Sequence, residues 1–297
     1  MTLRKELLDA ITKVIPNKPG FLVIYSSFSR LAPPGQFTSW DALYSIKKLI
    51  ARGWTIALPS FTFSFCKSGK YSYDKNKSET GIYADWVLKE INNSFRSKHP
   101  IYSFVLVGKN ANILDNMCST TTWGRDSIFS KFEEVNAQLL MLGCGLKSCT
   151  QIHRYEEINK VPYRSYKLFN GIIRNNNKTL KTTKKIYVRD LDLNPINDFS
   201  PIIKFLNNKN KIRSIKYQNI KIQSTSVKHI SNAANKILKK DVFALLKNKS
   251  QINKKLFYKN ENKNNFTIYL LGSSNLDILY NYFIDDLKKL LPDREFI

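Results

Sequence analysis

Short apolar runs alternate with amphipathic segments along the first 160 residues, and this alternation predicts an α/β protein built on a layered sheet. Leu and Ile recur at the spacing of one helix face over residues 3–15, and residues 40–51 and 85–93 also have a helical pattern. Residues 66–80 are polar and predict a long loop. Four apolar runs that stop at glycine, proline or paired serines predict buried strands. These expected strands are residues 20–25, 54–58, 102–107 and 139–142.

The second half of the chain predicts a hairpin, a helix and a C-terminal extension. Residues 169–192 are typical of two strands joined by an asparagine-rich turn, and residues 226–247 predict a helix. The Asn- and Lys-rich residues 248–265 are typical of a linker, and residues 266–297 predict one strand followed by one helix. We therefore expect a main domain over residues 1–247, a linker, and a β-α extension that starts a second domain which the chain does not complete.

The composition indicates a folded core and gives no sign of a metal or disulfide framework. Hydrophobic residues make up 42% of the chain and aromatic residues 12%, which excludes a wholly disordered protein. The four cysteines form no C-x-x-C pair and only three histidines are present, so we expect neither a zinc site nor disulfides. No apolar run reaches the ~18–20 residues that cross a bilayer, and the N-terminal segment lacks the features of a secretory signal. We expect a cytoplasmic protein without membrane insertion.

Positive charge dominates the chain, whose formal net charge is +25. Residues 204–263 alone hold 16 Lys and Arg against two acidic residues. Two interpretations fit this excess: a surface that binds an anion, or a composition that is rich in Lys, Asn and Ile throughout. No helix-turn-helix, zinc finger or aromatic RNA-binding pattern accompanies the charge, so nucleic acid is not an expected partner. A cleft in so basic a protein favours anionic over polycationic small molecules.

The segment with the most chemical information follows the expected strand at residues 139–142. That strand runs directly into Gly143 and Cys144, and a helix is expected from about Ser148. In open α/β sheets, ligands bind beyond the carboxyl ends of the strands, and glycine lets a ligand approach the backbone closely. This segment is therefore the first candidate for a binding site.

Two kinds of chemistry fit the expected helix. In the first, Glu156 lies three residues after His153 on one helix face, so its carboxylate can fix the imidazole tautomer and raise its basicity, as a general base requires. In the second, Cys149 lies four residues before His153, and the two form a Cys–His pair that carries an acyl group. Free cysteines are more often buried small hydrophobes, so we rank the general base first. A merely structural His–Glu contact remains the alternative to both.

Six segments of the chain have a characteristic combined spacing. They are YSSF at 25–28, LPSFT at 58–62, RSKHPIYS at 96–103, GRDS at 124–127, LGCGLKSCTQIHRYE at 142–156 and VPYR at 161–164. Taken together, these segments resemble the signature of the aminoglycoside 3-N-acetyltransferase family. The resemblance spans roughly residues 1–245 and rests on the set of segments, since no single one is specific.

The resemblance implies a fold and a reaction. Members of this family are three-layer α/β/α sandwiches with a central mixed sheet, so we expect this fold for an acyltransferase domain over residues 1–247. Members move an acyl group from coenzyme A to an amine, and the histidine that matches His153 is the expected base, with Glu156 as its orienting partner. A coenzyme A thioester is therefore the expected co-substrate, and no metal is expected.

The resemblance also suggests residues that contact the donor or the acceptor. Ser26 and Ser27 are expected to meet the pantetheine arm of the donor. Two interpretations of His99 stay open, since it either lines the cleft or closes a strand before Pro100, and Asp85 favours a structural role at a helix start. The expected binding residues are Ser26, Ser27, Thr62, Asp85, His99, Ser127, Gly143, Cys144 and Thr150.

Two departures from the family, together with the net charge, bear on the acceptor. The chain has Thr121 and Thr62 where many antibiotic-modifying members carry a histidine and an aspartate that suit polycationic aminoglycosides. We therefore expect the acceptor to be an amino sugar carried on an anionic nucleotide, of the kind used for surface glycans or natural products. The first alternative is aminoglycoside acetylation that confers antibiotic resistance. The second is an inactive module that binds an acidic carrier protein through residues 204–263.

Three expectations concern partners. An acyl carrier protein is a candidate donor as well as a candidate binding partner. Residues 268–274 weakly resemble the opening of HAD-like acyl-loading domains, which act with carrier proteins. A homodimer is a candidate assembly, which the sequence alone does not fix.

Overall fold

The structure, a computed structural model, describes residues 3–27, 30, 38–73, 75–115, 121–175 and 178–261. The chain divides into two compact units, residues 1–253 and 254–297. The expected β-α extension at 266–297 lies outside the described residues, and the domain boundary at residue 247 stays a prediction. Within the expected linker, Lys249–Glu261 form helix α10.

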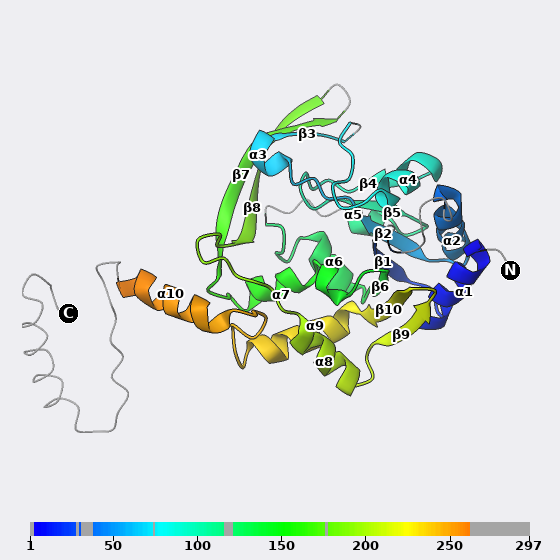
Figure 1. Ribbon diagram of the computed structural model, residues 1–297. Coiled ribbons are helices and arrows are strands. Elements are labelled where there is room, and N and C mark those ends of the chain that lie inside the picture. The colour runs from blue at the N-terminus through cyan, green and yellow to red at the C-terminus, as the bar shows by residue number, and fades with distance from the viewer. Residues whose placement is uncertain are drawn as a thin grey trace, which may run out of the picture. The chain divides into compact units, whose positions relative to one another are not determined.

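A seven-stranded mixed sheet forms the centre of the first unit (Figure 1). In spatial order its strands are β4 (Phe95–Arg96), β5 (Phe104–Val107), β2 (Thr55–Pro59), β1 (Phe21–Ser26), β6 (Gln138–Leu142), β10 (Ile220–Ser226) and β9 (Arg213–Tyr217). β1 pairs in parallel with β2 on one side and with β6 on the other, whereas the outer strands join by antiparallel pairing. The four strands expected from apolar runs are thus all present, as β1, β2, β5 and β6.

Helices cover both faces of this sheet, which confirms the predicted three-layer sandwich (Figure 1). One layer consists of α1 (Leu3–Val14), α2 (Ser39–Ala51) and α4 (Tyr83–Glu90). The other consists of α6 (Ile128–Glu134), α7 (Ile152–Ile158), α8 (Ser200–Asn208) and α9 (Val227–Leu238), and a short α5 (Asn112–Asp115) contacts α6. Alternate residues of the central strands, such as Leu22 and Ile24 of β1, pack in the core against the first layer. This alternation follows from the period of two along a strand, and it leaves the other set of side chains for the second layer.

A smaller sheet carries the predicted hairpin. Its strands are β3 (Lys70–Ser72), β7 (Arg164–Asn175) and β8 (Lys178–Arg189). β7 and β8 pair antiparallel along their whole length, so the hairpin prediction is confirmed. The expected loop at 66–80 is only partly a loop, because it contains β3, which pairs in parallel with β7, and most of the short helix α3 (Phe65–Ser68).

The Lys-rich residues 204–263 add two strands to the expected elements and shorten one expected helix. They contain β9 and β10, which the sequence pattern does not predict, because the edge strand β9 exposes Arg213, Ser214 and Lys216 and so has no continuous apolar run. The helix expected at 226–247 ends at Leu238. Shortly beyond that point the Asp241 carboxylate accepts a hydrogen bond from the backbone N–H of Phe243, and such an Asx turn offers the backbone an alternative to the helix.

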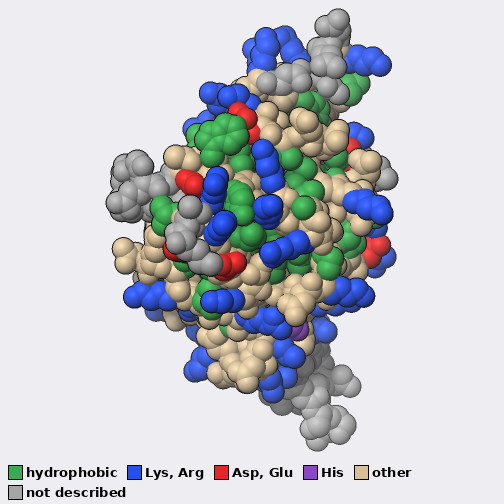
Figure 2. All heavy atoms as spheres, turned by 90° about the vertical axis from the view of Figure 1, so that its right-hand side faces the viewer, with side chains coloured by type: hydrophobic (Ala, Val, Ile, Leu, Met, Phe, Trp, Pro, Cys, Tyr) green, Lys and Arg blue, Asp and Glu red, His purple; other side chains and the backbone are tan. Residues whose placement is uncertain are grey.

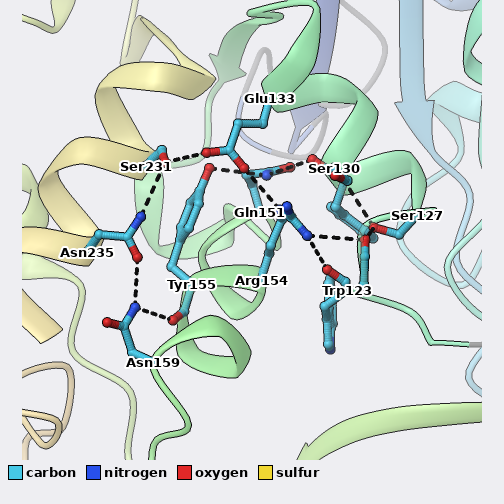
Figure 3. Close-up of polar contacts among 12 residues, drawn as sticks. Trp123, Ser127, Ser130, Glu133, Gln151, Arg154, Tyr155, Asn159, Ser231 and Asn235 are labelled. Carbon is cyan, nitrogen blue, oxygen red and sulfur yellow. Dashed lines mark hydrogen bonds and ion pairs between the residues drawn. The ribbon is translucent and has the colours of Figure 1, made fainter. Parts of the chain in front are cut away.

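A buried polar network fixes α7 against α6 and α9 (Figure 3). The guanidinium of Arg154 forms an ion pair with Glu133 at 3.0 Å (Nε to Oε2) and donates hydrogen bonds to the backbone carbonyls of Trp123 and Gly124. The other oxygen of Glu133 accepts a hydrogen bond from the Ser231 hydroxyl on α9. Arg154 therefore connects the segment that holds Trp123 to α7, the helix that also carries His153. Its side chain points from α7 toward α6.

Replacing Arg154 by Met should lower the free energy of unfolding by about 2–4 kcal/mol, because it leaves a half-buried carboxylate and two carbonyl groups without their partner. The matched control is Lys89→Met, which removes one positive charge from an exposed ion pair with Glu90 and should cost less than about 0.5 kcal/mol. Urea unfolding of the two variants measures the difference. Equal losses in both variants would contradict this role for the network.

Candidate functional site

A cavity of about 340 Å³ opens at the carboxyl ends of β1, β2 and β6. Ser26 lines it from the end of β1, Cys144 and Thr150 line it from the segment after β6, and His153 lines it from α7. Among the described lining residues there is no Lys, Arg, Asp or Glu. The cavity therefore lies where ligands bind in open α/β sheets, and its wall is neutral.

The side chains of His153 and Glu156 touch, as their i, i+3 spacing predicts. The distance from His153 Nδ1 to Glu156 Oε2 is 2.5 Å, and the second carboxylate oxygen accepts a hydrogen bond from the Tyr163 hydroxyl at 2.9 Å. The Glu156 side chain is fully buried, whereas 19% of the His153 side chain is exposed. Because a carboxylate only accepts hydrogen bonds, Nδ1 carries the proton, and Nε2 is left without a hydrogen bond to any described residue.

Aromatic side chains hold the imidazole ring in place. The rings of Trp123 and Phe199 meet the ring of His153 in edge contacts, with centroid distances of 5.7 and 6.0 Å. Arg154 in turn binds the backbone carbonyl of Trp123 (Figure 3). The ring is therefore oriented both by Glu156 and by the packing around it.

Burial and neighbouring charges favour an uncharged imidazole beside a charged carboxylate. Burial and the guanidinium of Arg164 lower the pKa of His153 below its ordinary value, and Glu156 opposes this shift only in part. Burial alone would raise the pKa of Glu156, but the nearby His153 and Arg164 hold that pKa below its ordinary value. Near neutral pH the pair therefore consists of a neutral base and an ionised orienting group.

The turn after β6 requires glycine. Gly143 has a φ of +67°, and a side chain there would place its Cβ 3.1 Å from the carbonyl oxygen of Ser27. The backbone N–H of Ser27 donates to the carbonyl of Leu142 and so extends the pairing of β1 with β6. Neither Gly143 nor Ser27 lines the main cavity, and Gly143 instead borders a second hollow of about 420 Å³ together with Cys144.

The helix expected from Ser148 differs from the structure. Residues Leu146–Ser148 form a single 3-10 turn, and α7 begins only at Ile152. The backbone N–H of Ser148 is bonded to the carbonyl of Gly145, which closes this turn. His153 therefore lies in the first turn of α7, next to the cavity, rather than in the middle of a longer helix.

His99 belongs to a structural turn rather than to the main cavity. Its Nδ1 accepts hydrogen bonds from the backbone N–H groups of Ile101 and Tyr102, and its Nε2 lies 3.1 Å from the Thr122 hydroxyl. Burial and the charge of Lys184 lower the pKa of His99 to about 3, so the ring stays neutral. Of the two interpretations of His99, these contacts favour the closing of a strand end.

Three further expected contact residues also lie outside the lining of the main cavity. The Asp85 carboxylate accepts a hydrogen bond from the backbone N–H of Ser78, which agrees with a structural role near the start of α4. Ser127 is the N-cap of α6, and its hydroxyl donates to the carbonyl of Gly124. Thr62 is buried between two residues that do line the cavity, and its hydroxyl has no hydrogen-bond partner among the described residues.

The structure argues against a Cys149–His153 pair that carries an acyl group. Cys149 is 1% exposed and does not line the cavity. Burial raises its pKa to about 12, so the thiolate that would attack an acyl group does not form near neutral pH. Cys144 does line the cavity, but burial raises its pKa to about 11.

The sequence interpretation assigns no role to several residues of the site. Phe61, Phe63, Tyr83 and Tyr102 supply most of the aromatic wall of the cavity. Arg164 reaches both Glu156 and His153, as described below, and its place in the VPYR segment was a signal that could have pointed to it. The aromatic residues come mostly from loops between elements, where local periodicity gives no signal.

No group of three or more described His, Cys, Asp and Glu residues could hold a metal ion. No described helix is both long and apolar enough to cross a membrane.

Solved structures with the same fold include several acetyltransferases. AAC-IIIb with bound CoASH has 14% sequence identity and a TM-score of 0.67, covering 80% of this chain and 96% of that one. The YokD protein from Bacillus subtilis has 18% identity and a TM-score of 0.65, covering 80% and 94%. A variant of the aminoglycoside acetyltransferase AAC(3)-IVa in complex with a gentamicin has 20% identity and a TM-score of 0.61, covering 82% and 89%. No curated protein sequence matches the chain.

The family itself follows from the sequence match rather than from these distant structures. Residues 5–239 match the model of the family described as aminoglycoside 3-N-acetyltransferase, which is well over half of the chain. The protein therefore belongs to the aminoglycoside 3-N-acetyltransferase family of N-acyltransferases.

Proposed function

We propose that the protein transfers an acetyl group from acetyl coenzyme A to an amine of an aminoglycoside. The observation that carries this proposal is the His153–Glu156 pair, in which a neutral imidazole lines a cavity and a buried carboxylate orients it. Such a pair is suited to taking a proton from an ammonium group, which cannot attack a thioester while it is protonated. Resistance to aminoglycosides is the cellular consequence of this reaction.

Coenzyme A is supported as the donor by family membership and by the AAC-IIIb structure, which holds CoASH. The cavity also fits the reactive end of such a thioester, since its wall is neutral and offers the hydroxyl groups of Ser26, Ser148 and Thr150. These hydroxyls can donate hydrogen bonds to the oxygen that gains charge when the thioester carbonyl is attacked. An acyl carrier protein as donor and a homodimeric assembly find no support in the comparisons and stay predictions.

The comparisons favour an aminoglycoside over a nucleotide-linked amino sugar as the acceptor. The AAC(3)-IVa variant holds a gentamicin, and none of the comparisons points to a nucleotide sugar or to glycan biosynthesis. The net charge that suggested an anionic acceptor is not found in the described cavity wall. Figure 2 shows Lys and Arg side chains scattered with few acids across the face that carries α1 and α2, whereas the described cavity wall holds none.

The proposed reaction needs one proton carrier. His153 takes a proton from the acceptor amine through Nε2, and the amine nitrogen forms a bond to the thioester carbonyl carbon. The tetrahedral intermediate then breaks its carbon–sulfur bond, and the imidazolium returns its proton to the leaving thiolate. The nitrogen gives up its second proton to water as the amide forms. Glu156 keeps Nδ1–H as a donor throughout, so Nε2 remains the reacting nitrogen.

Replacing His153 by Ala should lower the rate of thiol release from acetyl coenzyme A with gentamicin by about 10²–10⁴-fold, because the general base is lost. The matched control is His229→Ala on α9, a histidine that does not line the cavity and should leave the rate within about twofold. Full turnover by the His153 variant would contradict the mechanism. Thiol release with a nucleotide-linked amino sugar but not with gentamicin would contradict the acceptor, and binding of a carrier protein with no turnover would favour the inactive module.

The pH dependence of kcat/KM should show an acidic limb with a midpoint below 6.5. The sign follows from the lowered pKa of His153, since a group with a lowered pKa keeps its basic form to lower pH. In Glu156→Gln this limb should move to still lower pH, because the carboxylate that raises the pKa of His153 is gone, while kcat falls because the ring loses its orienting partner. Comparing both proteins with the same acceptor cancels the ionisation of the amine. A limb above 6.5 that does not move in the variant would contradict the assignment.

A further inference from the structure

The first residue of β7, Arg164, contacts both members of the His–Glu pair. Its Nε lies 2.9 Å from Glu156 Oε2, and its Nη2 lies 2.9 Å from His153 Nδ1. Its Nη1 is 3.4 Å from the backbone carbonyl of Tyr187 on β8. The Arg164 side chain is almost as buried as that of Glu156, so these charges interact with little screening by water.

Glu156 alone would slow proton transfer to and from His153. A buried carboxylate in contact with an imidazole stabilises the imidazolium, so the ring would hold its proton near neutral pH. A protonated ring cannot take a proton from an ammonium group, and it also releases a proton to a thiolate less readily. Burial opposes this effect of the carboxylate, and a positive charge close to the ring would oppose it further.

Arg164 is the charge in position to do this. Since His153 Nδ1 carries the proton that it donates to Glu156, it cannot also accept a hydrogen bond from Arg164, and the 2.9 Å approach is a contact between a positive charge and the ring. The same guanidinium forms an ion pair with Glu156, so the carboxylate and the guanidinium together carry no net charge. Glu156 therefore still orients the imidazole, while Arg164 reduces the effect of the Glu156 charge on the ring.

The other titratable groups around the ring do not replace it. Arg189 on β8 also lowers the pKa of His153, but by less than Arg164. Tyr163 is neutral, because burial raises its pKa far above the ordinary value, and its hydroxyl donates a hydrogen bond to Glu156. In the cavity wall, burial raises the pKa of Tyr102 to about 12 and that of Cys144 to about 11, so both are neutral as well.

We propose that Arg164 is a positioning residue of the reaction, which offsets the buried charge of Glu156 so that His153 stays unprotonated and can both take and return a proton. The catalytic role in this inference rests on the proposed function. The contacts of Arg164 with the ring do not depend on which acceptor is used. A purely structural alternative is that Arg164 only attaches β7 to α7. The two differ in whether the affinity of His153 for a proton depends on Arg164.

The test is a direct titration of His153 by NMR, which does not require turnover. The chain contains only three histidines, so the imidazole signals are few, and the variants His99→Gln and His229→Gln assign them. In Arg164→Met the pKa of His153 should rise by about one unit or more, and in Arg164→Lys it should stay within about half a unit of the unmodified protein. The matched control Arg189→Met should shift it by less than Arg164→Met. An unchanged pKa in folded Arg164→Met would overturn the proposal.

If Arg164→Met does not fold, the double variant Glu156→Gln/Arg164→Met provides the test. The double variant leaves no unpaired carboxylate in the interior. The pKa of His153 should fall in Glu156→Gln and return in Glu156→Gln/Arg164→Met to within about half a unit of the unmodified protein, since the two charges offset each other. Equal pKa values in the single Glu156 variant and the double variant would overturn the proposal. Absence of thiol release with every amine would overturn the proposed function alone, because the titration still reports on Arg164.

Discussion

The burial of the Glu156 carboxylate is the constraint on which the rest of the site depends. An ionised group without contact with water costs several kcal/mol unless other groups pair with it. Here three side chains do so, from the same helix, from the turn that follows it and from the start of β7: His153, Tyr163 and Arg164. Because all three side chains must contact one carboxylate, they restrict the path of the chain from α7 to β7. The same contacts restrict the orientation of the imidazole.

The sheet supplies the cavity that this imidazole faces. β1 has the parallel neighbours β2 and β6, one on each side. The connections that leave the carboxyl ends of these three strands diverge to opposite sides of β1. Such a divergence leaves a crevice that backbone alone does not fill. Gly143 turns the chain sharply at the end of β6, which brings the segment with Cys144 and Thr150 to this crevice and α7 to its edge. The fold thus places the base beside the cavity, and the network around Arg154 holds it there.

Sequence reasoning succeeded where a feature depends on residues close together in the chain. The four central strands, the hairpin and the contact between His153 and Glu156 all follow from local periods of two or of three to four residues. It missed the Lys-rich edge strand β9, whose exposed side chains hide its pattern. It left His99 open between the cleft and a strand end, and the backbone contacts of His99 favour the strand end. Arg164 was visible only as part of a motif, since its contacts exist only once β7 packs against α7.

The net charge shows why a property of the whole chain is a poor guide to a site. A charge of +25 suggested an anionic acceptor, yet the described cavity wall carries no ionised side chain. The charges closest to the imidazole are Glu156 and Arg164, which are buried in direct contact with it and act on its pKa in opposite directions. Surface charges are screened within about 8–10 Å at physiological ionic strength, whereas this buried pair is not. Burial and the charges in contact with the ring therefore govern the proton affinity of the base, rather than the surface excess of the whole chain.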